Sequence, residues 1–327
     1  VNSMGEYVFI GCRSLESIAI PGAVEKIEFA VFDGCTNLKS VQLPKSITAI
    51  FAYAFNNCPA LESINIPDGV TSIGKNAFRE CNSLLSINIP EGITKIEEGT
   101  FQNCSSLQSI AIPNSVTVIG KGAFEKCSSL QSITIPDGVT KIQPCVFYNC
   151  SGLESVILPN SITCIDESAF ANCTNLQTIN VPDNVKEIGQ SAFYNCANLQ
   201  SINVPDGVPS IGKYTFSGCS SLKSIDIPDS VNSIGEYAFS SCRKLESVTL
   251  PKDLTKIETG TFNVCTNLRT INIPDVIVSI GDSAFWGYED LESLSLPNGF
   301  QSIGKAVPGE KTLLDAFYPA CQAFENA

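Results

Sequence analysis

The chain of 327 residues contains no histidine. This absence excludes Ser-His-Asp and Cys-His catalysis, histidine ligation of a metal and a histidine pH switch. Basic residues are scarce, since 20 lysines and arginines stand against 33 aspartates and glutamates and leave a formal net charge of −13. Such an acidic surface disfavours nucleic acid and anionic membranes as partners. No apolar run approaches the ~18 residues of a membrane span, so no membrane insertion of this segment is expected.

The fifteen cysteines include no C-x-x-C pair, so the spacing typical of a zinc site is missing. Twelve of them recur every 23 residues from Cys12 to Cys265. Neighbouring members of this column are expected to point in the same direction into one core, which is poor geometry for a disulfide. We therefore predict twelve buried, unpaired thiols. Cys145, Cys164 and Cys321 lie outside the column, and for Cys145 and Cys164 both exposed thiols and a mutual disulfide stay open.

A strict 23-residue repeat accounts for nearly the whole chain. Phenylalanine recurs thirteen times at this spacing, from Phe9 to Phe285, and leucine follows six residues after each one. The period holds without insertion or deletion from Val1 to Ile303. A fixed period of this length is typical of a solenoid, in which each coil buries its apolar face against its neighbours.

Each position of one unit has a physical interpretation. Around Ile64 the apolar and polar residues alternate, which predicts a half-buried strand. Pro67 lacks an N–H group and ends that strand, and Asp68-Gly69 then forms a turn. Gly74 is interpreted as permitting a sharp bend. The residues after it have the spacing of a short helical turn, so the side chains predicted to face the core are Ile64, Ile66, Val70, Ile73, Ala77, Phe78, Cys81 and Leu84.

The repeated string SIGxxAFxxCxxLxxIxIPxxV resembles the BspA-like (Treponema pallidum type) leucine-rich repeat. The resemblance implies an α/β-type solenoid, a right-handed leucine-rich-repeat horseshoe. It would have about thirteen coils, a concave parallel β-sheet and short helical turns on the convex side. It also implies a surface or secreted protein of a bacterium or a parasitic protist, often linked to adhesion.

We expect a single repeat array over residues 1–304. It starts mid-repeat, because Val1-Asn2-Ser3-Met4-Gly5 aligns with Val231-Asn232-Ser233-Ile234-Gly235, and we expect it to be part of something longer. Residues 305–327 depart from the repeat and are predicted to be a degenerate C-terminal cap that packs through Leu313, Leu314 and Phe317. A linker to another domain is the alternative.

Three recurring patterns outside the core each have a simple explanation. Acidic residues follow the proline at Asp68, Glu91, Asp137, Asp183, Asp206, Asp229 and Asp275, where turn chemistry explains them better than a calcium site does. Tyr148, Tyr194 and Trp286 share the position after the phenylalanine but are too scattered for one surface patch. The three N-C-[ST] triplets, at Asn103, Asn149 and Asn172, fit the polar flanks of the cysteine better than glycosylation.

No catalytic, cofactor-binding or metal-binding residue is assigned, so the sequence predicts a non-catalytic protein. The leading hypothesis is an extracellular or cell-surface interaction and adhesion module that binds a host matrix protein, a cell-surface protein or a glycan on its concave face. The alternative is a structural spacer or a self-assembling surface protein. The expected ligand-binding residues vary from coil to coil, are polar for the most part and have no role in the core. They are Glu154, Ile157, Gln177, Asn180, Gln200, Asn203, Lys223, Asp226 and Glu246.

Overall fold

The computed structural model describes residues 3–287 and 301–304. Its contacts divide the chain into two compact units, Val1–Leu176 (unit 1) and Gln177–Ala327 (unit 2), each of which is described by itself. The predicted cap at 305–327 and Cys321 lie outside the described residues. The right-handed path and the horseshoe curvature stay predictions.

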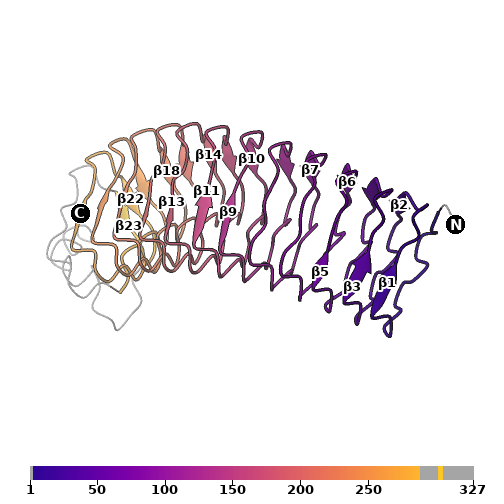
Figure 1. Ribbon diagram of the computed structural model, residues 1–327. Helices are drawn as coiled ribbons and strands as arrows, with labels where there is room; N and C mark the ends of the chain where they lie inside the picture. Colours follow the sequence, from indigo (N-terminus) through magenta and orange to yellow (C-terminus); the bar gives the residue numbers. More distant parts are fainter. Residues whose placement is uncertain (1–2, 288–300, 305–327) are drawn as a thin grey trace. The chain divides into compact units, whose positions relative to one another are not determined.

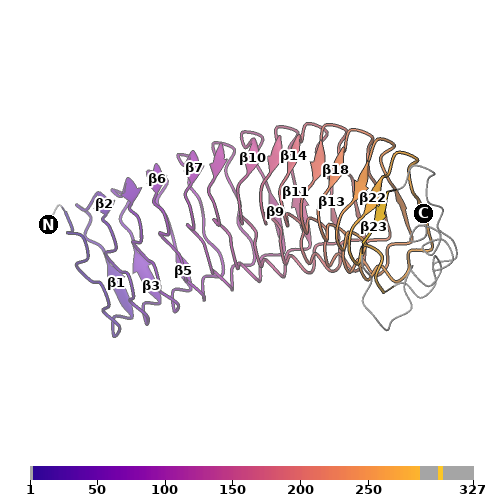
Figure 2. The same cartoon turned by 180° about the vertical axis from the view of Figure 1, so that it is seen from behind.

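Except at residues 86–88 and 109–111, where no strand forms, successive coils pair through parallel strands, as the L-x-x-I-x-I pattern predicts. In unit 1 strand Ser17–Ala19 pairs with Ser40–Gln42, and Ser17 lies opposite Ser40, its equivalent one coil later. The middle residue of each strand is inward-facing and its neighbours are exposed. We call the row formed by these strands, one from each coil that has one, the first ladder (Figures 1 and 2). Its strands are β1 (Ser17–Ala19), β3 (Ser40–Gln42), β5 (Ser63–Ile64), β9 (Ser132–Thr134) and β11 (Ser155–Ile157) in unit 1, and β13 (Thr178–Ile179), β15 (Ser201–Ile202), β17 (Ser224–Asp226), β19 (Ser247–Thr249) and β21 (Thr270–Asn272) in unit 2.

A second row of parallel strands, which the sequence analysis did not predict, forms just before the glycine position. The strand Lys26–Ile27 pairs with Ala49–Ile50, again with a 23-residue offset. Two-residue strands alone give too weak an alternation to be recognised from sequence. This second ladder consists of β2 (Lys26–Ile27), β4 (Ala49–Ile50), β6 (Ser72–Ile73), β7 (Lys95–Ile96), β8 (Val118–Ile119), β10 (Lys141–Ile142) and β12 (Cys164–Ile165) in unit 1, and β14 (Glu187–Ile188), β16 (Ser210–Ile211), β18 (Ser233–Ile234), β20 (Lys256–Ile257), β22 (Ser279–Ile280) and β23 (Ser302–Ile303) in unit 2.

The short helical turns predicted around the phenylalanine do not form. Within residues 3–287 and 301–304 there is no helix, and hence none that could cross a bilayer. The segment is a series of turns in which alternate N–H groups bond to the next coil, as from Tyr53 to the Lys75 carbonyl at 3.0 Å and from Phe55 to the Ala77 carbonyl at 2.8 Å. The N–H groups between them bond three residues back in the same coil, as from Asn56 to the Tyr53 carbonyl at 3.0 Å. Left-handed residues stand two positions before and after the phenylalanine, with φ of 60° at Tyr53 and 53° at Asn57. Such residues interrupt a right-handed helix and turn the peptide groups toward the neighbouring coil.

The core is a column of stacked phenylalanine rings, as predicted. Phe32 and Phe55 are fully buried, and their ring centroids lie 5.3 Å apart at an angle of 9°. The same stacking continues in unit 2, where the rings of Phe239 and Phe262 lie 5.5 Å apart. Phe9, in the first coil, is only partly buried. Each ring is therefore covered by its equivalents, which is the mutual burial that defines a solenoid.

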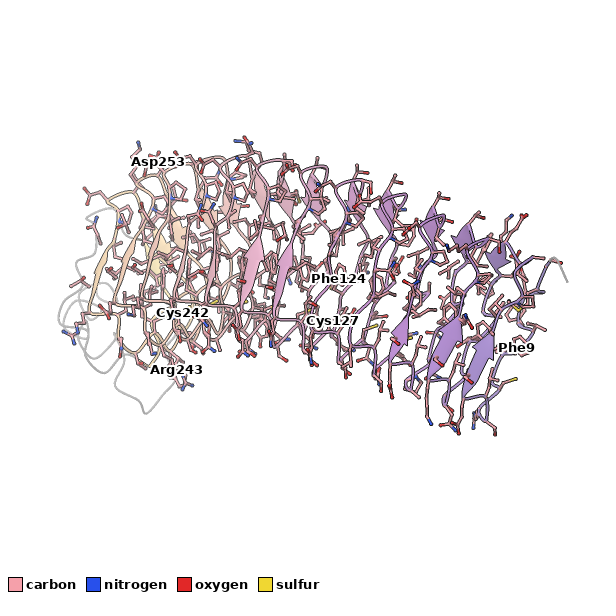
Figure 3. All side chains as sticks on the ribbon, viewed as in Figure 1. Phe9, Phe124, Cys127, Cys242, Arg243 and Asp253 are labelled. Carbon is pink, nitrogen blue, oxygen red and sulfur yellow. The ribbon has the colours of Figure 1, made fainter. Side chains whose placement is uncertain are left out.

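The cysteine column lies beside these rings. Eleven of its twelve members are buried, whereas Cys12 in the first coil is exposed and corrects the prediction for that residue. Buried members donate their thiol proton to the carbonyl oxygen of the phenylalanine one coil earlier, as from Cys104 to Phe78 at 3.2 Å. Phe124 and Cys127 lie inside the stack, and Arg243 at its margin (Figure 3). Cys145 is a half-buried free thiol, and Cys164 is buried, so the expectation of an exposed thiol is wrong for Cys164.

Where glycine precedes the turn, as at Gly74, it lies in close contact with the backbone of the preceding coil, a role that the sequence analysis did not predict. A Cβ atom added to Gly74 would lie 2.7 Å from the Phe51 carbonyl carbon, in the backbone of the preceding coil. In unit 2 the same addition at Gly235 would meet the backbone nitrogen of Lys213 at 2.7 Å. Backbone atoms cannot rotate away as a side chain can, so a methyl group added at Gly74 or Gly235 requires the backbones of the two coils to shift.

We expect Gly74→Ala to lower the free energy of unfolding by about 1–3 kcal/mol, because the new methyl group overpacks the contact between coils. Gly22→Ala is the matched control, since nothing lies within 4 Å of a Cβ added there. Urea unfolding followed by circular dichroism measures both. Equal stability of the two variants would contradict the role assigned to Gly74.

Burial of the cysteine column makes the stability sensitive to alkaline pH. Burial raises the pKa of the Cys104 thiol from 9.0 to about 12. The unfolded chain therefore loses this proton first, and the stability it contributes is present below pH 9 and is lost as the pH rises toward 12. The free energy of unfolding should fall between pH 9 and 11 in both proteins, but less steeply in Cys104→Ala than in the unchanged protein. The difference in slope should be up to ~1.4 kcal/mol per pH unit. Denaturant unfolding across this range tests it, and an unchanged slope would refute it.

Candidate functional site

The outward face of the first ladder in unit 2 carries most of the predicted ligand-binding residues. Four of them occupy the same position in consecutive coils, one residue before each strand. Their backbones form successive rungs: Gln200 N–H donates to the Gln177 carbonyl at 2.9 Å, Lys223 to Gln200 at 3.3 Å, and Glu246 to Lys223 at 2.9 Å. All four residues are exposed. The repeat thus brings these exposed residues together in a row at the starts of the strands.

The charged members of this face are available to a partner. Lys223, Asp226 and Glu246 are exposed, and among the described residues none of the three forms an ion pair. Asp226 ends β17, where it lies opposite Thr249 of β19. The face therefore presents one cation and two anions beside uncharged amides. Such a mixed surface is suited to a partner that carries both signs of charge.

Asn203 corrects the expectation that every one of these residues has no structural role. Its side-chain amide donates to the Val181 carbonyl at 2.7 Å, and its carbonyl oxygen accepts the Val181 N–H at 2.9 Å. Val181 is buried, so this amide satisfies backbone groups of the preceding coil that water cannot reach. Asn88 binds Ile66 in the same way in unit 1. Asn203 is therefore part of the scaffold, whereas Asn180 is exposed and its side chain makes no hydrogen bond within the described residues.

The two remaining predicted residues lie in unit 1, on the equivalent face. Glu154 is exposed and its N–H donates to the Gln131 carbonyl at 2.8 Å. Ile157 ends β11, lies opposite Thr134 of β9 and is 63% exposed. An exposed isoleucine at a position with no core role is consistent with a contact residue, although single exposed apolar side chains are common.

An aromatic cluster in unit 2 joins tyrosines from two different positions of the repeat, which the sequence analysis did not connect. The rings of Tyr214 and Tyr237 stack at 5.3 Å, and Tyr194 meets Tyr214 edge-on at 6.4 Å. The Lys213 ammonium lies 5.2 Å from the Tyr214 ring and 2.6 Å from a Glu236 oxygen. Tyr214 and Tyr237 are half-buried and support neighbouring coils, whereas Tyr194 is 41% exposed.

The acidic residues after the prolines lie in hydrogen-bonded turns. The proline carbonyl accepts an N–H group three residues on, as from Val70 to Pro67 at 3.0 Å. Asp229 accepts the Lys252 N–H at 3.1 Å and lies 3.2 Å from its ammonium group. The backbone hydrogen bond, with the ammonium group beside it, lowers the pKa of the Asp229 carboxyl. These contacts link turns of successive coils and need no bound cation.

Comparison with known proteins identifies the repeat. The family described as BspA type Leucine rich repeat region matches residues 2–128, 94–223 and 186–311. A leucine-rich repeat protein from Bacteroides ovatus is 33% identical with a TM-score of 0.79, over 94% of this chain and 88% of the other. A leucine rich cell surface protein from Faecalibacterium prausnitzii is 28% identical with a TM-score of 0.58, over 96% and 92%. A leucine-rich repeat protein from Eubacterium ventriosum is 25% identical with a TM-score of 0.61, over 91% and 92%. No curated protein sequence matches the chain.

Asn203 and Asn180 provide a matched pair of variants. We expect Asn203→Ala to lower the free energy of unfolding by ~1–3 kcal/mol, because it leaves the buried N–H and C=O of Val181 without partners. Asn180→Ala, at the same position one coil earlier, should change it by less than ~0.5 kcal/mol. Denaturant unfolding of both variants decides. If the two lose the same stability, the side chain of Asn203 is not a structural bridge.

Proposed function

Because the chain belongs to the BspA-type leucine-rich repeat family, we propose that it is a non-catalytic interaction module that acts at the cell surface or outside the cell. Two observations support the location: a structural relative from Faecalibacterium prausnitzii is described as a cell surface protein, and the sequence resembles a family of surface proteins. The lack of histidine supports binding over catalysis.

The proposed binding surface is the outward face of the first ladder in unit 2. It is centred on Gln177, Gln200, Lys223, Asp226 and Glu246, and Asn180 extends it. The observation that carries the proposal is that these side chains lie on consecutive rungs, exposed and without ion pairs among the described residues. They can therefore change in evolution without disturbing the stacked core. In the horseshoe that the sequence predicts, this face is the concave one.

We infer that the partner is a host matrix or cell-surface protein, with a glycan as the second choice. Lys223, Asp226 and Glu246 carry charges of both signs that form no ion pair among the described residues. They favour a protein, whose surface offers complementary carboxylate and ammonium groups. The amides of Gln177 and Gln200 both donate and accept hydrogen bonds, which suits either class. Glu154 and Ile157 occupy the equivalent face of unit 1 and are proposed as additional contacts.

A spacer or a self-assembling surface protein is the alternative function. Side-by-side assembly of identical copies meets electrostatic opposition, because each carries a formal net charge of −13. A spacer would need no exposed charge of mixed sign on the sheet face. These two observations favour binding to another molecule.

The double variant Gln200→Tyr/Lys223→Tyr tests the surface. Bulky rings on adjacent rungs would obstruct a partner while leaving the inward residues untouched, so we expect attachment to matrix proteins or host cells to fall at least about tenfold. The measurement is binding of the full chain to immobilised fibronectin, fibrinogen, collagen and laminin, and to epithelial cells. Circular dichroism verifies the fold.

The matched control is Asn232→Tyr/Thr255→Tyr, which places the same rings on exposed positions next to the second ladder of the same unit. It should attach as the unchanged protein does. Full attachment by the folded Gln200/Lys223 variant would remove the binding role from this face. Equal loss in both double variants would indicate a general effect of surface tyrosines.

A further inference from the structure

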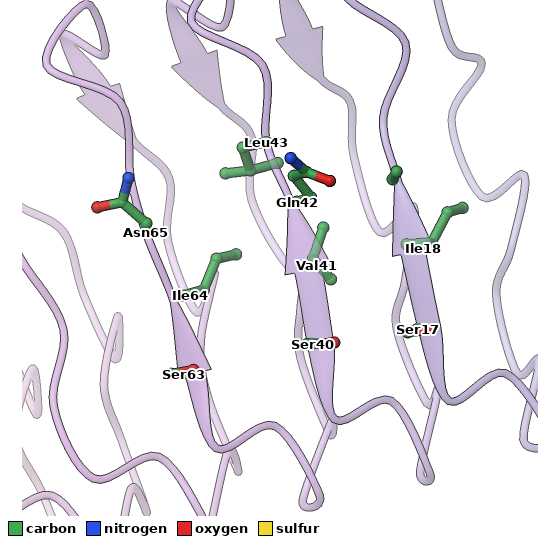
Figure 4. Close-up of a pocket in the computed structure, with 10 residues that line it drawn as sticks. Ser17, Ile18, Ser40, Val41, Gln42, Leu43, Ser63, Ile64 and Asn65 are labelled. Atoms are coloured by element: carbon green, nitrogen blue, oxygen red, sulfur yellow. The ribbon is translucent and has the colours of Figure 1, made fainter.

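A shallow hollow lies on the face of the first three strands of the first ladder in unit 1. It has a volume of about 590 Å³, and its lining comes from β1, β3 and β5 and the residues directly after β3 and β5 (Figure 4). Three serine hydroxyls from successive coils form one row across it. Ala19, Gln42 and Asn65 form the next row, two residues further along each strand.

Every residue that lines the hollow is uncharged, in a chain with a formal net charge of −13. The residues directly before the three strands, Glu16, Lys39 and Glu62, are charged but do not line the hollow, and Glu16 and Lys39 form an ion pair of 2.9 Å. An ionic ligand would have to give up hydration here without gaining a countercharge from the lining itself. The hollow therefore favours a ligand that carries no charge.

The polar groups of the lining are free to bind. The side chains of Gln42 and Asn65 and the three serine hydroxyls are exposed and make no side-chain hydrogen bond within the described residues. Hydroxyl and amide groups both donate and accept, so they match a ligand whose own groups do the same. Exposed Ala19 and half-buried Ile18 add apolar surface that can contact ring faces, whereas Val41 and Ile64 are buried in the core behind the hollow.

Strand addition by a peptide does not explain this hollow. The backbone of β3 is paired on one side with β1 and on the other with β5, so no main-chain hydrogen bonds remain for a peptide that lies over it. A peptide would have to be recognised by neutral side chains alone. Carbohydrate presents hydroxyl groups around its rings and apolar C–H surfaces on their faces, and both kinds of group find partners here.

We propose that this hollow binds an uncharged oligosaccharide through the hydroxyls of Ser17, Ser40 and Ser63 and the amides of Gln42 and Asn65. The site is separate from the charged face proposed for unit 2, whose first-choice partner is a protein. It does not depend on that face binding a protein.

Calorimetric titration of the full chain with cellohexaose, maltohexaose, mannohexaose and xylohexaose tests the proposal, with hexagalacturonate as the charged probe. We expect at least one neutral hexaose to bind and hexagalacturonate to fail. Raising the salt concentration should leave the affinity nearly unchanged, because no charge is involved. If none of the four neutral hexaoses binds, or only hexagalacturonate does, the proposal is overturned.

Gln42→Arg should weaken the neutral hexaose about tenfold or more by filling the hollow and adding a charge. The matched control is Thr134→Arg, which places the same side chain at the same strand position of β9, outside the hollow. Asn65→Arg is the second variant should Gln42→Arg fail to fold. Undiminished binding by either folded variant overturns the proposal, as does equal weakening by Thr134→Arg. The Gln200→Tyr/Lys223→Tyr variant should bind the hexaose normally, which separates failure of this site from failure of the face in unit 2.

Discussion

Hydrogen bonding between residues about one repeat apart is the constraint on which the rest of this structure depends. Three segments of each coil take part: the first ladder, the second ladder and the turns around the phenylalanine, as in the bond from Phe55 to Ala77. A neighbour one rung away can satisfy all three only if the coils keep the same length. The chain accordingly carries no insertion through thirteen copies. Close approach at Gly74 and stacking of Phe32 on Phe55 follow from this spacing.

This constraint divides the surface into residues that join coils and residues that are free. Asn203 and Asn88 are exposed, yet both hold the backbone of the preceding coil. Lys223 and Asp226 are also exposed, but their side chains form no hydrogen bond or ion pair within the described residues. Exposure alone therefore does not mark a binding residue in a solenoid. A contact surface is built from side chains whose removal leaves every backbone hydrogen bond in place.

The sequence was sufficient for the strand of the first ladder, the proline turn and the buried column from Ile64 to Leu84, because these depend on side-chain hydrophobicity at a fixed period. The sequence was insufficient for features that depend on backbone conformation or on contacts of the backbone with another coil. Left-handed residues such as Asn57 replaced the expected helical turns, and only the frequency of asparagine and glycine just before the cysteine indicated them. The bridging role of Asn203 had no signal of its own, since Asn180 occupies the same position without a bond. Gly74 was recognised, but the contact that requires it belongs to another coil.

The same strand position carries different chemistry in the two units. At the third residue of the strand unit 1 has Gln42 and Ile157, and unit 2 has Asp226 and Thr249. The inward neighbours of all four are Val or Ile, so the core is the same behind each. A change on the outer face costs the core nothing, because alternate residues of a strand point to opposite sides. A neutral hollow and a charged face can therefore arise in one chain by point substitution alone. The repeat is thus a scaffold whose binding properties must be determined coil by coil, and membership of the family cannot supply them.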